Sequence, residues 1–284
     1  RAMNQRGMFA QAYVHDQDWA SRTDRIGDRQ NLSSYQSQTY GALFSHQYSD
    51  ETSENRWGIE LTTRTNVDIT ELERPLQGEA TLIGLVNSGN ERVSGVFADR
   101  MWFFSNTSLR AGTRLDRSQV SNEGSSRTET KLNGQVQIDT RLPNDWLIAG
   151  ELGTAHRLPT LSELHFSGQT PRGTIRGNSL LAPEETIGSQ VTLSRQSDNL
   201  EFELSVFYNR VENYIERMRA EDGSLTYQNL RSGRIWGFDG EVSLGGTNQI
   251  KQRIKWQWQR GKADNGEFLD DLPPPEVSYT GTWH

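Results

Sequence analysis

The sequence predicts an all-β protein, an antiparallel transmembrane β-barrel, and three observations support this fold class. Polar and apolar residues alternate along most of the chain, and no helical periodicity competes with this pattern. Many alternating stretches exceed the about 5–6 residues of a typical soluble strand and reach the about 9–11 residues that cross an outer membrane. Short turns and long connections follow one another in regular order, which is typical of barrels with periplasmic turns and extracellular loops.

The composition excludes several other classes of protein. Only 33% of the 284 residues are hydrophobic, and no stretch approaches the about 18 consecutive apolar residues of a membrane-spanning helix. A barrel tolerates this composition because only every second wall residue faces lipid. The net charge of −7 disfavours nucleic-acid binding, which requires a basic surface. Without cysteine, the chain forms no disulfide, thiolate metal site or cysteine nucleophile.

The alternation predicts the face that each wall side chain takes, because neighbouring residues of a strand point to opposite sides. The apolar residues expected to face lipid are Leu132, Val136, Ile138, Phe202, Leu204, Val206, Trp236, Phe238, Ile254 and Trp256. The polar residues expected to face the lumen are Lys131, Gln135, Asp139, Glu201, Glu203, Asp239, Glu241, Arg253 and Lys255. Aromatic residues near the expected strand ends fit the interfacial girdles of a barrel, although the core of a soluble β-protein would use the same residue types.

We expect about twelve strands, joined alternately by short turns and long connections. The short turns are expected near residues 50–55, 105–106, 143–145, 197–199 and 245–248. The long connections are expected at residues 19–33, 72–91, 122–128, 160–183, 218–224 and 262–275. Because a strand begins almost at residue 1 without an apolar signal core, we interpret residues 1–284 as part of a barrel domain, truncated at both ends.

Two short motifs flank the connection at residues 160–183. Residues 153–164 read GTAHRLPTLSEL, and residues 177–184 read GNSLLAPE. They resemble the paired signatures of TonB-dependent outer-membrane receptors, a Phe-Arg-Ala-Pro box at the end of one strand and a Gly-Asn-Pro-x-Leu-x-Pro-Glu box at the start of the next. The matching residues are Arg157, Pro159, Thr160, Glu163, Leu164, Gly177, Asn178, Leu180, Pro183 and Glu184. His156, Leu158 and Ser179 depart from the family pattern, which leaves the ligand subfamily open.

Three further stretches resemble the same family in the expected order. Residues 112–116 resemble its Gly-x-Arg-x-Asp strand, residues 207–209 its next outgoing strand, and residues 227–241 its Tyr-x-Asn and Gly-x-Glu strand. The resemblance covers roughly residues 57–284. It implies a parent barrel of about 22 strands, of which this chain holds about twelve, and a lumen filled by a plug domain that this chain does not contain.

The resemblance also implies a function, a location and partners. The parent protein would be a receptor of the outer membrane for active, energy-coupled uptake of a scarce nutrient. An iron-siderophore or another metal chelate is the expected ligand, with cobalamin and haem as alternatives. The receptor would act as a monomer in outer-membrane lipid, driven by the energy-transducing protein TonB through the missing plug.

Motifs for catalysis are absent from the sequence. It contains no hydrolase elbow, phosphate-binding loop, dinucleotide glycine motif or zinc-binding helix. The five histidines are scattered without the spacing of metal ligands, so we expect no enzyme, no cofactor and no metal site. Calcium at Asp222, or at Asp264 and Asn265, is an alternative to the turns that these residues usually form. Two other classes of protein stay open, a passive porin or barrel adhesin and a secreted all-β enzyme or carbohydrate-binding protein.

The connection at residues 160–183 is the expected binding site, because long structureless loops are usually functional and the wall is committed to lipid and backbone pairing. Its cationic and aromatic side chains suit an anionic, ring-bearing chelate: His165, Phe166, Gln169, Arg172 and Arg176. Two alternatives remain open for these residues. Arg172 and Arg176 could instead bind lipopolysaccharide phosphates, and His165 could ligate haem iron, as the family resemblance implies.

Overall fold

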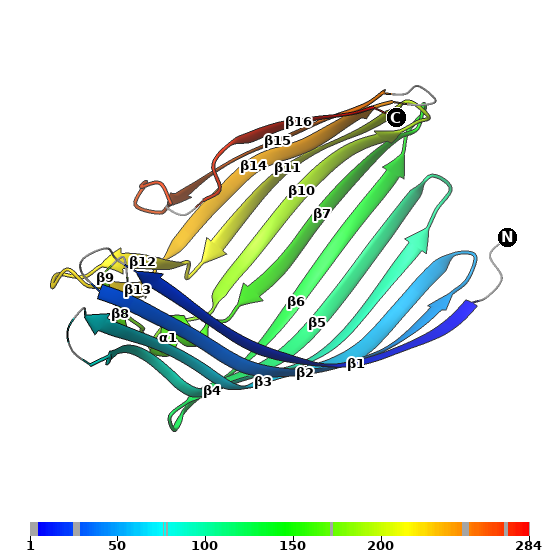
Figure 1. Ribbon diagram of the computed structural model, residues 1–284. Helices are drawn as coiled ribbons and strands as arrows, with labels where there is room; N and C mark the ends of the chain where they lie inside the picture. The colour runs from blue at the N-terminus through cyan, green and yellow to red at the C-terminus, as the bar shows by residue number, and fades with distance from the viewer. Residues whose placement is uncertain are drawn as a thin grey trace.

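The computed structural model describes residues 5–24, 29–75, 77, 79–170, 173–245, 250–269 and 272–283. Twelve long strands of these residues form one curved wall, with β1 and β16 at its two edges (Figure 1). The wall strands are β1 (Gln5–Asp24), β2 (Arg29–Ser49), β3 (Ser53–Pro75), β4 (Thr81–Phe103), β5 (Thr107–Asn122), β6 (Ser125–Arg141), β7 (Trp146–Arg157), β10 (Glu184–Gln196), β11 (Leu200–Glu212), β14 (Ser232–Leu244), β15 (Ile250–Ala263) and β16 (Glu276–Trp283). Each pairs antiparallel with the next wall strand along the chain, so the predicted all-β class and strand number are confirmed.

The register places apolar and polar side chains on opposite faces of the wall. Val206 of β11 lies opposite Val191 of β10 and Phe238 of β14, so these three side chains share one face. We call it the apolar face, and the other the polar face. Apolar-face residues are exposed, 55% for Val206 and 69% for Leu132, because the described residues form a single sheet with no second sheet packed on it. The predicted separation of the two sets of side chains is confirmed.

The short turns lie together at one end of the wall, as predicted. Residues 50–52, 104–106, 142–145 and 197–199 join successive wall strands there, and residues 246–249 lie outside the described residues. Asn144 and Asp145 adopt positive φ angles of 61° and 64°, which these residue types tolerate in tight turns. The chain therefore reverses its direction within a few residues at this end.

The opposite end of the wall departs from the sequence prediction. Strands β1 to β4 extend through most of the connections expected at residues 19–33 and 72–91, and the connection expected at residues 122–128 is a tight turn between β5 and β6. Charged residues, prolines and glycines in these strand ends, such as Arg22, Asp24, Pro75 and Gly84, interrupt the alternation. They pair nonetheless, and the Ser33 hydroxyl donates to Glu71 across the strands at 2.6 Å. The expectation of long connections here is wrong, because backbone pairing requires no apolar face.

Two connections at this end fold into short elements. α1 (Leu161–His165), β8 (Ser167–Thr170) and β9 (Gly173–Arg176) lie between β7 and β10; β12 (Ile215–Arg219) and β13 (Leu225–Asn229) lie between β11 and β14. β8 pairs with the end of β4 and with β9, and β9 runs parallel to β13, so these short strands extend the sheet beyond β4 (Figure 1). We call residues 158–183 and 213–231 the loop cap. The expectation of a structureless loop at residues 160–183 is wrong, because its backbone groups pair within the loop cap.

Helices contribute little to the described residues. None of the helices found there is long and apolar enough to cross a membrane. The single turn of α1 starts at Thr160 and ends at Phe166, whose N–H donates to the Ser162 carbonyl. Its role is to turn the chain from β7 toward β8.

Candidate functional site

A cluster of buried apolar side chains anchors the loop cap to the wall. Leu161 and Leu164 of α1 pack with Val67 of β3 and Val86 of β4, at the ends of these long strands. The other buried members of the cluster are Val120, Phe166, Ile175, Leu181 and Ile215. Burying an aliphatic side chain of this size stabilises a fold by about 1.5–3 kcal/mol. The loop cap is therefore a packed unit with its own core.

The motif arginine joins this unit to the wall. Arg157, the last residue of β7, donates from Nε to Glu184 Oε2 at 2.6 Å and pairs through Nη1 with Glu163 Oε2 at 2.9 Å. Glu163 also accepts from the Thr160 N–H at 2.7 Å, while the Thr160 hydroxyl accepts from the Glu163 N–H, which makes the capping box that starts α1. Glu184 accepts from the Ile215 N–H at 2.8 Å. These charged motif residues tie both connections of the loop cap to β7 and β10.

The second box shapes the chain between β9 and β10. A Cβ at Gly177 would lie 2.7 Å from the backbone carbon of Leu164, so only glycine allows this approach. Asn178 Nδ2 donates to the Tyr227 carbonyl at 2.9 Å, and its Oδ1 accepts from the Leu180 N–H at 3.0 Å. The Leu180 side chain is 88% exposed. Pro159 and Pro183 are both buried at the ends of this segment, where wall pairing stops.

The residues expected to bind ligand lie in different environments. Phe166 is 7% exposed and belongs to the apolar cluster, so it packs the loop cap and is closed to a ligand at the surface. His165 is half-buried at the end of α1, and burial lowers the pKa of its imidazole, which is neutral at pH 7. Arg176 is exposed on β9. Arg172 and the side chain of Gln169 lie outside the described residues.

Arg176 contacts the second connection of the loop cap. Its Nη1 lies 3.1 Å from Asp222 Oδ2 in the turn between β12 and β13. The Ser224 hydroxyl and N–H both donate to Asp222, and these hydrogen bonds lower the pKa of the Asp222 carboxyl. Asp222 and likewise Asn265, which accepts from the Glu267 N–H at 3.0 Å, form turns. In the described part of the chain, no three His, Cys, Asp or Glu side chains gather as metal ligands.

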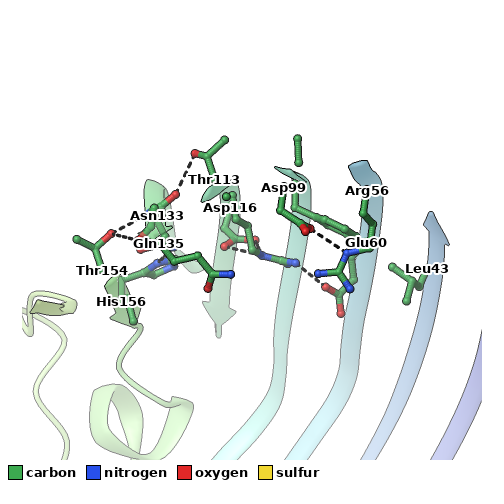
Figure 2. Close-up of a pocket in the computed structure, with 16 residues that line it drawn as sticks. Leu43, Arg56, Glu60, Asp99, Thr113, Asp116, Asn133, Gln135, Thr154 and His156 are labelled. Atoms are coloured by element: carbon green, nitrogen blue, oxygen red, sulfur yellow. Dashed lines mark hydrogen bonds and ion pairs between the residues drawn. The ribbon is translucent and has the colours of Figure 1, made fainter. Parts of the chain in front are cut away.

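A second site, not predicted from the sequence as a site, lies on the polar face of β2 to β7. A cavity of about 510 Å³ opens there, lined by charged residues from neighbouring strands (Figure 2). Arg56 Nε lies 2.9 Å from Asp99 Oδ2. Arg114 pairs with Glu60 Oε2 through Nη1 at 2.8 Å and with Asp116 Oδ1 through Nε at 2.8 Å. These five side chains form a ladder of ion pairs across β3, β4 and β5.

Uncharged residues complete this ladder. The Phe97 ring lies under both guanidinium groups, with its centroid 5.7 Å from Arg56 Cζ and 5.9 Å from Arg114 Cζ. Gly95 leaves the space that Arg114 and its acidic partner occupy, since a Cβ there would strike both. At the far side, Asn133 Nδ2 donates to His156 Nδ1 at 2.8 Å (Figure 2). The cavity wall is thus a fixed polar surface, suited to dock another polar surface.

The sequence contained part of the signal for this second site. Alternation within residues 112–116 already places Arg114 and Asp116 on one face of a strand. Glu60 and Phe97 come from other strands, and only the register brings them opposite. An alternating pattern fixes the face of a residue but carries no information about its cross-strand neighbour.

The comparisons with known proteins agree with this architecture. The family model described as TonB dependent receptor-like, beta-barrel matches residues 2–283. Among solved structures, the copper transporter OprC has a TM-score of 0.82 at 20% sequence identity, over 98% of this chain and 47% of that one. The ferric yersiniabactin uptake receptor FyuA from Yersinia pestis has a TM-score of 0.71 at 10% identity, over 98% and 44%.

A third solved structure gives the same picture. The ferric citrate transporter FecA in its unliganded form has a TM-score of 0.68 at 11% identity, over 98% of this chain and 44% of that one. At these identities the likeness shows the fold alone. The chain spans about half the length of the solved structures it matches. Among curated protein sequences, none matches this chain.

Proposed function

This chain belongs to the TonB-dependent receptor-like β-barrel family of the outer membrane. We therefore propose that it forms part of the wall and the outer mouth of a receptor for energy-coupled nutrient uptake. The nutrient is an iron-siderophore or another metal chelate, with cobalamin and haem as alternatives. The receptor acts as a monomer, and the protein TonB drives it through a plug domain in the lumen. The chain itself has no enzymatic role.

The observation that carries this proposal is a two-faced wall with a folded cap at one end. The apolar face offers exposed side chains to lipid, as at Val206 and Leu132. The polar face offers the ion-pair ladder around Arg114, a surface suited to contact a plug. The loop cap presents Arg176 at the end of the wall opposite the short turns, where an incoming ligand arrives first.

The ligand class rests on the chemistry of the similar structures and of the loop cap. OprC is named a copper transporter, FyuA a ferric yersiniabactin uptake receptor and FecA a ferric citrate transporter. These names favour a metal or an anionic metal chelate for this chain as well. Exposed Arg176 and the neutral imidazole of His165 are the described candidates to contact it, and Gln169 and Arg172 belong to the same connection.

The proposal is tested by metal uptake into whole cells that carry the complete receptor. Labelled ferric siderophores of the hydroxamate, catecholate and carboxylate types are offered, together with copper, cobalamin and haem. We expect uptake of one metal chelate, and we expect a protonophore to abolish it because the plug requires energy. Uptake that persists after the proton gradient collapses would identify a passive porin and overturn the proposal.

A pair of variants tests the binding residues. Arg176→Ala removes an exposed cation and should weaken ligand binding about tenfold, the effect of one charge-assisted hydrogen bond. The control Asn144→Gly lies in the turn at the opposite end of the wall, where glycine accepts the positive φ of 61°. It should leave ligand affinity unchanged. Barrel assembly is followed for both variants by heat-modifiable electrophoresis, and equal affinity in both would remove Arg176 from the binding site.

A further inference from the structure

A row of basic side chains crosses the apolar face of β11, β14 and β15 near the loop end of these strands. Arg210 of β11 lies opposite Arg234 of β14, and Arg234 lies opposite Lys262 of β15. Arg260, two positions before Lys262, points to the same face. All four residues are exposed. Like charges directly opposite each other destabilise a sheet, so this row favours an anion lying across it.

The protein itself balances mainly one of these four charges, that of Arg210, on which both Glu212 and Asp264 act. Arg210 Nε pairs with Glu212 Oε1 on its own strand at 2.7 Å. Among the described residues, no carboxylate forms an ion pair with Arg234, Arg260 or Lys262. Arg260 Cζ and Lys262 Nζ instead lie 5.3 Å and 5.0 Å from the centroid of the exposed Phe268 ring. The row therefore keeps donors that are available to an external anion.

Aromatic side chains place the row at the outer boundary of the membrane. Tyr208 lies opposite Trp236, and Trp236 lies opposite Arg260, so aromatics and cations are direct neighbours on this face. The rings of Phe238 and Trp258 stack at 5.6 Å in the next layer. Aromatic residues of barrels take the headgroup level of the bilayer. The cations thus lie at the level of the phosphates of the outer leaflet.

We propose that this row, which we call the basic row, docks a phosphorylated glycolipid of the outer leaflet, with a diphosphorylated sugar headgroup of the lipid A type. Guanidinium groups bind phosphate through paired hydrogen bonds, and Arg234 and Lys262 stand next to each other for this purpose. Directly below, Val206, Phe238 and Ile254 offer exposed apolar surface to the acyl chains. A free phosphate would use the cations but not this apolar surface, so the combination favours a lipid.

Another part of the wall provides a matched contrast. Arg92 of β4 and Arg117 of β5 are also exposed cations of the apolar face. Their cross-strand neighbours are uncharged: Thr63 and Gln119 for Arg92, Ser94 and Thr130 for Arg117. Removing these two cations changes the net charge as much as removing two from the basic row, but it leaves the basic row intact.

The experiment is native mass spectrometry of the complete receptor in detergent, titrated with diphosphoryl lipid A. The double variant Arg234→Gln with Lys262→Gln should bind lipid A at least about tenfold more weakly than the unmodified protein. Arg92→Gln with Arg117→Gln should bind like the unmodified protein. Lipid A stripped of its phosphates should bind all three proteins equally weakly. If both double variants lose the same lipid A affinity, the net charge of the protein accounts for the loss, and the proposal is overturned.

Two further measurements separate the sources of phosphate and the effects on folding. Inorganic phosphate at millimolar concentration should not displace lipid A, and full displacement would identify a free-anion site and overturn the docking of a lipid. Because the cations repel one another in lipid-free detergent, their removal should leave the heat-modifiable band of the folded barrel unchanged. If the double variant fails to fold, the single variant Arg234→Lys tests the proposal instead. It keeps the positive charge but loses the paired hydrogen bonds of the guanidinium. It should weaken lipid A binding measurably, and unchanged binding would contradict the proposed role of the guanidinium.

Discussion

The wall and the loop cap are stabilised in different ways. In the wall, backbone pairing holds each strand, while side chains such as Val191 remain 53% exposed on a single sheet. In the loop cap, side chains such as Leu181, 1% exposed, pack into a core, and Arg157 connects it to the wall by ion pairs. The difference shows that an exposed apolar residue is normal in one region and a defect in the other, because lipid covers only the wall.

The same comparison explains the two sequence motifs. Their residues lie where the wall gives way to the loop cap, and Glu163, Gly177 and Asn178 are all used in contacts within the protein. The motifs therefore encode the junction of the two regions. On the proposed function, ligand preference would come from exposed residues of the same connections, such as Arg176.

The largest expected effect is a charge on the apolar face of the wall. Val191→Arg should destabilise the barrel by about 2–4 kcal/mol, because the apolar face contacts lipid. The adjacent Gln190→Arg places the same charge on the polar face, where water reaches it, and should cost much less. Urea unfolding of the complete receptor from lipid vesicles measures both. Equal costs would mean that the two faces are not lipid and lumen.

A smaller and local effect is expected in the loop cap. Gly177→Ala forces the new Cβ against the backbone of Leu164 and should open the loop cap at a cost of about 1–3 kcal/mol. The wall control is Gly150→Ala, where the nearest atom to a Cβ is Ile138 Cγ2 at 3.5 Å, an ordinary contact. Hydrogen exchange should show faster exchange of β8 and β9 in the first variant only. Unchanged protection in Gly177→Ala would show that the loop cap is not held at this point.

The smallest effect concerns ion pairs. Arg157→Gln leaves Glu163 and Glu184 without their shared partner and should loosen the loop cap by about 1–2 kcal/mol. Arg64→Gln removes the single pair with Glu91 at 3.0 Å in the wall and should cost under about 1 kcal/mol. Limited proteolysis tests the contrast. Cleavage within residues 158–183 should be faster in Arg157→Gln than in Arg64→Gln. Equal cleavage rates in the two variants would show that the two ion pairs of Arg157 do not hold the loop cap.

The wall was largely predictable from the sequence because its physical signal is local. Alternation decides the face of each residue from its two neighbours, and Val206, Glu203 and Phe238 lie on the expected sides. The ends of β1 to β4 were not predicted as strands, since charged residues, prolines and glycines interrupt the alternation there while backbone pairing continues.

The loop cap and the two sites were predictable only in part. Family resemblance identified Arg157, Glu163 and Gly177, but their sequence positions say nothing about the contacts they make. Phe166, expected to contact ligand, is a core residue because it meets Val67 and Val86, about 80–100 positions earlier in the chain. Such long-range packing has no sequence period.

The sequence by itself determined that this protein is a two-faced antiparallel wall of the outer-membrane barrel type with a motif-bearing junction. Only the tertiary structure decided that residues 158–170 and 173–183 fold, that Arg114 pairs with Glu60, and that Arg210, Arg234 and Lys262 lie in one row. The physical reason is the same in each case. The face that a side chain takes is set within one strand. The residues that it contacts depend on the register between strands and on the packing of segments far apart in the chain.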